Sequence, residues 1–228
     1  MEGIQRFNLY VSTATVAVMF GIIEYVMPML QASGIPPALL QLIPFAAPVQ
    51  IVEASKLVIA ALATLGTYRL LAKILIPSID HLPFIKPLIF GPSYVEGTWI
   101  GRFGAPTQLK WTVEHFEQDF AGIVIRGHAQ NKNGTPYASW TSSAASVHPL
   151  HGTLTYMYNC DIIGHSTPQQ GIGAFTFERA NARKAPIAIR GYSTDLVDGL
   201  RSANHEIKIS NKFLAVEEAM KIARDRFK

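Results

Sequence analysis

Two long apolar stretches occupy the first third of the 228-residue chain. Residues 7–30 carry one charge, Glu24, and exceed the roughly 20 apolar residues that cross a bilayer core. Residues 49–76 are a weaker candidate, because charged residues interrupt them and the basic ones must reach toward the interfaces. The interrupting residues are Glu53, Lys56, Arg69 and Lys73. The pattern predicts a transmembrane helical hairpin over residues 1–78, with a signal peptide or a buried soluble hairpin as alternatives.

The charges around these stretches predict the topology. Arg6 precedes the first stretch, basic residues end the second, and the proline-rich segment between them is uncharged. The positive-inside rule then places both termini in the cytoplasm. Glu24 and Lys56 fall at similar depths of such a hairpin, so they either pair or each reach the far interface. Together with Arg69 they are the candidate membrane-depth charges.

From Tyr94 the pattern changes from helical to alternating, after a proline-rich connector over residues 79–93 that favours a stiff link. Eight short strands with turn signals between them predict an antiparallel meander that closes into a barrel or packs as a sandwich, over residues 94–228. A C-terminal helix follows, with Phe213 and Met220 on one face and Asn211 as its cap. The predicted strands are 95–104, 107–117, 121–130, 136–147, 152–159, 172–180, 186–195 and 204–210.

Composition supports this division. The chain is only 16% charged, against roughly a quarter in ordinary soluble proteins, and residues 1–92 hold just 5 Lys/Arg and 4 Asp/Glu. The net charge of +4 is too weak and too scattered to indicate a nucleic-acid partner, and we expect no DNA or RNA. The sole cysteine, Cys160, excludes an internal disulfide framework.

An eight-stranded barrel is either filled by side chains or holds one small ligand. One face of a predicted strand carries Leu154, Tyr156 and Tyr158, and an Ile-x-Ile-Arg-Gly pattern occurs twice, around Arg126 and Arg190. Arginine beside aromatic residues suits a nucleotide, because guanidinium binds phosphate and aromatic rings stack on bases. Alternation alone favours the opposite placement, with both arginines in solvent and the isoleucines filling the barrel.

Catalytic motifs are not apparent. The pairs His148/His151 and Cys160/His165 lack further ligands for a zinc site, and the Gly-x-Gly at residues 171–173 lacks the context of a dinucleotide fold or a P-loop. No Gly-x-Ser-x-Gly elbow occurs. We therefore expect no enzyme, no metal and no cofactor.

The order of elements and one motif resemble a known family. Two membrane helices and a short linker precede Tyr94, Gly97, Trp99 and Gly101 at the start of a β-rich domain. This resembles the two-helix, β-barrel effectors of CBASS, the cyclic-oligonucleotide antiphage systems. Gly-x-Trp also opens lipocalins, so the expected fold is a membrane α-helical hairpin plus an all-β, eight-stranded antiparallel lipocalin-like barrel with a C-terminal helix, and Trp99 is best interpreted as structural. Weaker matches are Leu154, Tyr156 and Tyr158, and Gly191, Tyr192, Asp195 and Gly199.

The resemblance implies a multi-pass protein of the inner membrane with a cytoplasmic barrel. The barrel would bind a cyclic di- or oligonucleotide second messenger as its regulatory ligand, the protein would assemble into homo-oligomers, and its helices would disrupt the lipid bilayer. Residue type and alternation, rather than the motif, select the candidate ligand-binding residues from both strand faces. They are Arg126, His128, Tyr137, Trp140, Tyr156, Tyr158, Arg190 and Tyr192.

Two other functions remain open at this point. One is a membrane-anchored, lipocalin-like barrel that carries or senses a lipid or other apolar ligand. The other is a packed structural module that binds only protein. The inward face of the barrel discriminates between the nucleotide and the lipid functions. Arginines with aromatics favour a nucleotide, and an all-apolar lining favours a lipid.

Overall fold

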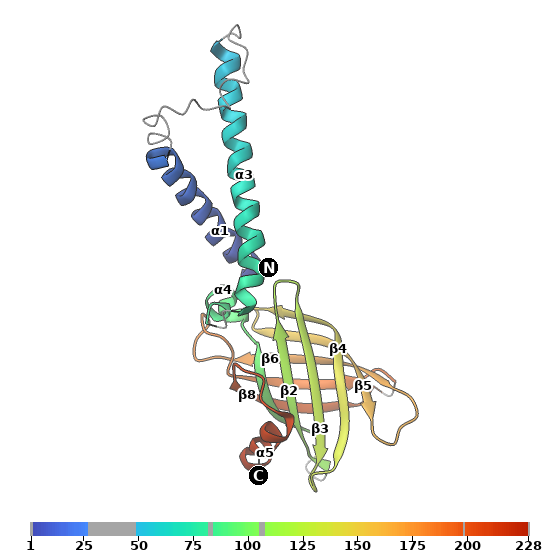
Figure 1. Cartoon of the computed structure of the whole chain (residues 1–228). Coiled ribbons are helices and arrows are strands. Elements are labelled where there is room, and N and C mark those ends of the chain that lie inside the picture. Colours follow the sequence, from blue (N-terminus) through green and yellow to red (C-terminus); the bar gives the residue numbers. More distant parts are fainter. Residues whose placement is uncertain (1, 27–48, 82–83, 105–107, 198, 228) are drawn as a thin grey trace. The chain divides into compact units, whose positions relative to one another are not determined.

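The structure, a computed structural model, describes residues 2–26, 49–81, 84–104, 108–197 and 199–227. The chain divides after Ile85 into two compact units, a helical one and a β-barrel (Figure 1). Residues from Lys86 onward belong to the barrel unit, so the stretch expected to be a connector is shared between the two units.

The helical unit contains α1 (Glu2–Gly21), a π-helical turn η1 (Ile22–Val26) and α3 (Val49–His81). Within the described residues one helical segment, Phe7–Tyr25, is long and apolar enough to cross a membrane, and an N-terminal signal sequence would meet the same criterion. The described residues therefore support one candidate span rather than the expected two-helix membrane hairpin, and the link between the two helices lies outside them.

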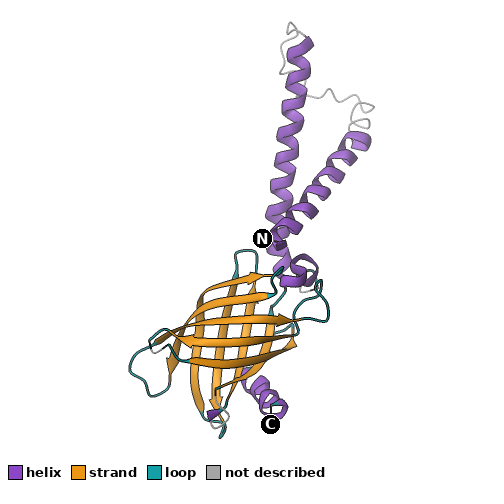
Figure 2. Cartoon of the chain, turned by 180° about the vertical axis from the view of Figure 1, so that it is seen from behind, coloured by secondary structure: helices purple, strands orange, loops and turns teal. Residues whose placement is uncertain are grey.

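Eight antiparallel strands form a closed barrel in which each strand pairs with its sequence neighbours and β8 pairs with β1 (Figure 2). The prediction of eight strands is confirmed, and the barrel alternative holds over the sandwich. Asn131 and Thr135 close the predicted β3–β4 hairpin turn, with Gly134 at φ 84°. The strands are β1 (Gly97–Phe103), β2 (Lys110–Gln118), β3 (Ile123–Asn131), β4 (Pro136–His148), β5 (Thr153–Ile162), β6 (Gln169–Glu178), β7 (Ala188–Asp195) and β8 (Arg201–Ser210).

An apolar core fills one end of the barrel interior. Trp99 is fully buried, stacks on Phe116 with ring centroids 5.1 Å apart, and donates its indole N–H to the carbonyl of Val95 at 2.8 Å. The short segments α4 (Lys86–Phe90) and η2 (Gly91–Ser93) precede this core, and the buried Lys86 ammonium binds Glu96 at 2.8 Å. Trp99 is therefore structural, as expected, and the chain enters the barrel at its packed end.

A second core lies outside the barrel, under helix α5 (Val216–Arg226). Ala219, Met220 and Ala223 of α5 pack on outward-facing side chains of β1 and β2, including the buried Ile100 and Val113. The predicted C-terminal helix is confirmed, but the prediction that Asn211 caps it is wrong. It begins after Ala215 without a side-chain cap, and Phe213 is half exposed.

Candidate ligand-binding cavity

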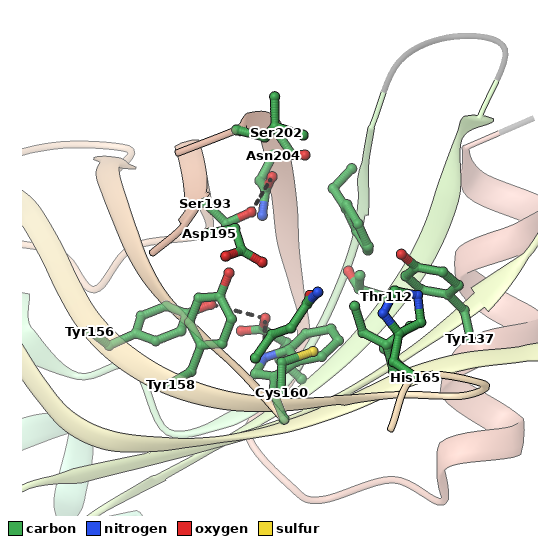
Figure 3. A pocket seen from close by; sticks show the side chains of 17 residues that line it. Thr112, Tyr137, Tyr156, Tyr158, Cys160, His165, Ser193, Asp195, Ser202 and Asn204 are labelled. Atoms are coloured by element: carbon green, nitrogen blue, oxygen red, sulfur yellow. Dashed lines mark hydrogen bonds between the residues drawn. The ribbon is translucent and has the colours of Figure 1, made fainter. Parts of the chain in front are cut away.

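The other end of the barrel is hollow. A cavity of about 300 Å³ lies between the apolar core and the barrel rim, within the size range of small-molecule sites (Figure 3). β1 runs from the packed end, at Trp99, to the cavity, at Phe103. The cavity therefore lies at the end of the barrel opposite to the one where the chain enters. Its lining residues are Phe103, Thr112, Glu114, Tyr137, Ala138, Trp140, Tyr156, Tyr158, Cys160, Ile162, His165, Gln169, Ser193, Asp195, Leu200, Ser202 and Asn204.

Glycines on neighbouring strands make room for the large side chains of this interior. Gly127 pairs with Trp140 across β3 and β4, and a Cβ on Gly127 would lie 2.1 Å from the indole. Gly171 pairs in the same way with Tyr158, where the corresponding distance to the ring is 2.3 Å. These rings therefore lie against bare backbone of the adjacent strand, which leaves the centre of the barrel open.

Two buried carboxyl groups lie on the inner face, those of Glu114 and Glu206, each only 2% exposed. Glu114 Oε1 accepts the indole N–H of Trp140 at 3.1 Å and the hydroxyl of Tyr156 at 3.2 Å, and Glu114 is hydrogen-bonded to Glu206. The Oε2 atoms of both carboxyls find no N–H or O–H donor among the described groups. A proton on either carboxyl would supply a donor to the other.

Burial decides the protonation of this pair. Desolvation raises the pKa of Glu114 to about 7, against the opposing hydrogen bonds from Tyr156, Glu206 and Trp140. Desolvation and then the charge of Glu114 raise the pKa of Glu206 well above its ordinary value. The pair therefore carries at least one proton at neutral pH.

Nearer the rim, Tyr158 and Cys160 lie two residues apart on β5, and Asp195 of β7 lines the same part of the cavity (Figure 3). Burial, followed by the charges of Cys160 and Asp195, raises the pKa of Tyr158 to about 12 against a hydrogen bond with Ser193. Burial and the charges of Asp161 and Asp195 raise the pKa of Cys160 to about 11. The tyrosine is therefore a neutral hydrogen-bonding group, and the thiol is protonated and unreactive at neutral pH.

The structure brings four of the eight predicted ligand-binding residues to the cavity and places four outside it. Tyr137, Trp140, Tyr156 and Tyr158 line the cavity. The other four are not among the lining residues: Arg126, His128, Arg190 and Tyr192. Whether any of the eight binds a ligand stays a prediction.

The four residues outside the cavity lie where the alternation of side chains along their strands places them. Because Ile125 and Ile189 are fully buried in the inner core, their neighbours Arg126 and Arg190 face solvent. Arg126 forms an ion pair with Glu117, and Arg190 forms one with Glu178. His128 is also exposed, and Tyr192 lies under the Arg201 guanidinium at 4.4 Å. Arg126 and Arg190 therefore lie on the outer face of the barrel, which is the placement that alternation favoured, and not in this cavity.

Sequence reasoning missed the acidic residues of the interior, Glu114, Glu206 and Asp195. Because outward-facing residues of β1, β2 and β8 pack with α5, these outward positions are apolar, whereas Glu114 and Glu206 lie on the inner face. Alternation in β2 suggests that Val113 faces inward, whereas it faces α5. Asp195 did appear in one of the weaker family matches, and its position two residues after Ser193 on an inward face was the available signal.

The candidate membrane-depth charges belong to the helical unit. Glu24 lies in η1 and is exposed, as is Arg69 of α3. Lys56 lies in α3, but its side chain is outside the described ones, so its pairing with Glu24 is untested. Over the described residues, no group of three or more His, Cys, Asp or Glu side chains is arranged to hold a metal ion.

Comparison with known proteins gives no relative: no family model, no curated protein and no solved structure matches this chain.

Proposed function

We propose that this chain is a membrane-bound sensor of the CBASS type, whose barrel binds a cyclic di- or oligonucleotide. The supporting observation is the aromatic cavity in an otherwise packed barrel, with Trp140, Tyr156 and Tyr158 seated over glycines or against each other. Aromatic side chains stack on nucleobases at about 1–3 kcal/mol per base. No catalytic step is part of this proposal.

The polar lining suits a base better than an alkyl chain. Tyr158, Ser193, Asn204 and Asp195 present hydroxyl, amide and carboxylate groups to the cavity. A lipid tail would remove these groups from water without replacing their hydrogen bonds, which costs about 1–3 kcal/mol for each group. A nucleobase edge, in contrast, carries donors and acceptors that match them. The lipid-carrier alternative is therefore less well supported than the nucleotide one.

The proposed response links occupancy of the barrel to self-association and to the membrane. Apolar side chains lie exposed on the loops at the cavity end of the barrel, including Ile163 and Val197, which are 65% and 80% exposed. Ligand binding that rearranges these loops would change which surfaces self-associate. In this proposal the barrel is lipocalin-like and cytoplasmic, and both helices span the inner membrane with cytoplasmic termini.

A thermal-shift screen of the full-length protein in detergent, against cyclic di- and trinucleotides, tests the proposal. At least one compound is expected to raise the melting temperature in a concentration-dependent way. Tyr158→Leu removes a cavity ring and should abolish this shift.

Tyr192→Leu is the matched control, because it removes the same side chain from the outer face of the barrel and should leave the shift intact. The double variant Arg126→Ala/Arg190→Ala should also retain it, since both arginines face solvent. Absence of a shift with every cyclic nucleotide would contradict the proposal, and so would equal loss in Tyr158→Leu and Tyr192→Leu.

A further inference from the structure

The charge of the cavity determines which part of a ligand can enter it. None of the 17 lining residues, all of them described, is lysine or arginine, and His165 is the sole histidine among them. Glu114 and Asp195 contribute carboxyl groups instead. A phosphate inside this cavity would face acidic groups without a guanidinium or ammonium to pair with.

Asp195 is placed to bind a ligand. It is the last residue of β7, and Figure 3 shows its carboxylate directed into the cavity beside the hydroxyl of Tyr158. Its Oδ1 accepts the backbone N–H of Val197 at 2.7 Å, which fixes the carboxylate at the start of the β7–β8 loop. Asp195 lines the cavity, and its negative charge contributes to the raised pKa of both Tyr158 and Cys160.

Cations lie at the rim instead of in the cavity. The Lys110 ammonium is 4.1 Å from the ring centroid of Tyr137 and 5.5 Å from that of Phe103, two lining residues at the open end. An anionic group held at this rim would approach Lys110, while the part of the ligand that enters meets aromatic rings and hydrogen-bond acceptors.

We infer that the cavity binds the N–H-bearing edge of a planar nitrogen heterocycle, with the Asp195 carboxylate accepting its hydrogen bond and any phosphate remaining outside the rim. The identification of the heterocycle as a nucleobase rests on the proposed function, whereas the acceptor role of Asp195 does not. Guanine fits this site because its ring N–H and amino group are adjacent donors on one edge, suited to a carboxylate.

The test uses guanosine and inorganic pyrophosphate as probes of the full-length protein in detergent, with guanosine binding followed by saturation-transfer NMR. Guanosine is expected to bind, and excess pyrophosphate is expected not to displace it. Asp195→Asn should weaken guanosine binding about tenfold or more, because a charge-assisted hydrogen bond is lost while the Asn side-chain oxygen can still cap Val197.

Asp161→Asn is the matched control, since Asp161 is exposed on the opposite face of β5 and should bind guanosine like the original protein. The inference is overturned if guanosine does not bind, if pyrophosphate displaces it, or if Asp195→Asn binds it unchanged. Guanosine binding that depends on Asp195, without any response to cyclic nucleotides, would support this inference and contradict the proposed function. A response to cyclic nucleotides that is unaffected by Asp195→Asn would do the reverse.

Discussion

Glycine–aromatic pairs keep half of this barrel hollow. Trp140 and Tyr158 each lie over a glycine of the adjacent strand, so that their rings lie along the wall. An eight-stranded barrel has room for either packed side chains or one small ligand. At the packed end, in contrast, fully buried side chains such as Trp99, Phe116 and Leu154 form the inner core.

Gly127→Ala should damage the cavity. The added Cβ would lie 2.1 Å from the Trp140 indole, so the ring must move, and overpacking of this kind costs about 1–3 kcal/mol. Chemical denaturation measures the loss of stability. Gly122→Ala is the control, because its Cβ would have no atom within 4 Å. Equal effects of the two substitutions would refute the wall-lining role of Gly127.

The Glu114–Glu206 pair makes stability depend on pH. Because burial raises the pKa of Glu114 to about 7, the folded protein binds more protons than the unfolded chain between about pH 4.5 and 7. The contribution of Glu114 to stability is therefore greatest at low pH and is lost as the pH rises through 7, by about 1.4 kcal/mol per pH unit for each extra proton bound. The contribution of Glu206, whose pKa is also raised, has the same sign.

Denaturation across this pH range measures the effect, with Glu114→Gln/Glu206→Gln as the comparison. The amide side chains preserve the shape and do not titrate, so this variant should lack the decline that the original protein shows between pH 5 and 7. Parallel pH profiles for the two proteins would mean that the pair does not titrate as described.

At the scale of elements, the alternation of side chains along a strand predicted which residues face the barrel interior, wherever the outer face of that strand meets water. In β5 the aromatic face of Tyr156 and Tyr158 was evident from alternation, and the inward isoleucines of β3 and β7 were a stated alternative. In β2 and β8 the outer face is apolar because α5 covers it, so local polarity indicates the wrong face. Glu114 and Glu206 were missed for this reason, since the apolar outer positions that pack with α5 resemble an inner face in the sequence.

The packing of α5 gives a prediction for this element. Met220 is 1% exposed and lies in the outer core, so Met220→Ala should destabilise the barrel by about 2–5 kcal/mol. Ile222→Ala, on the same helix but 36% exposed, should cost about 1 kcal/mol or less. Thermal denaturation compares the two. Similar losses would indicate that α5 does not pack on β1 and β2.

At the scale of the whole molecule, the chain combines a helical unit with a barrel that contains a cavity. Composition alone predicted this division, because charges are scarce in residues 1–92. Composition did not determine the number of membrane-spanning helices in the same way, because α3 carries charged residues along its length.

The charges of the helical unit should matter for membrane damage and not for ligand binding. Neutralising Glu24 and Lys56 together, as Glu24→Gln/Lys56→Met, should reduce toxicity on expression. Clustered helices would otherwise bring these polar groups together at lipid depth. The thermal shift with a cyclic nucleotide should be unchanged. Toxicity equal to that of the original protein would contradict a role for these charges in opening the membrane.

Occupancy of the cavity by a cyclic nucleotide is the central claim, and Cys160 reports it directly. It is the only cysteine of the chain and lines the cavity. Its alkylation rate, followed by mass spectrometry on the full-length protein at alkaline pH, where part of the thiol is ionised, therefore measures access to the interior. At least one cyclic di- or trinucleotide should slow alkylation severalfold at saturation, and Tyr158→Leu should remove this protection. Alkylation at the same rate with and without every cyclic nucleotide would contradict the account.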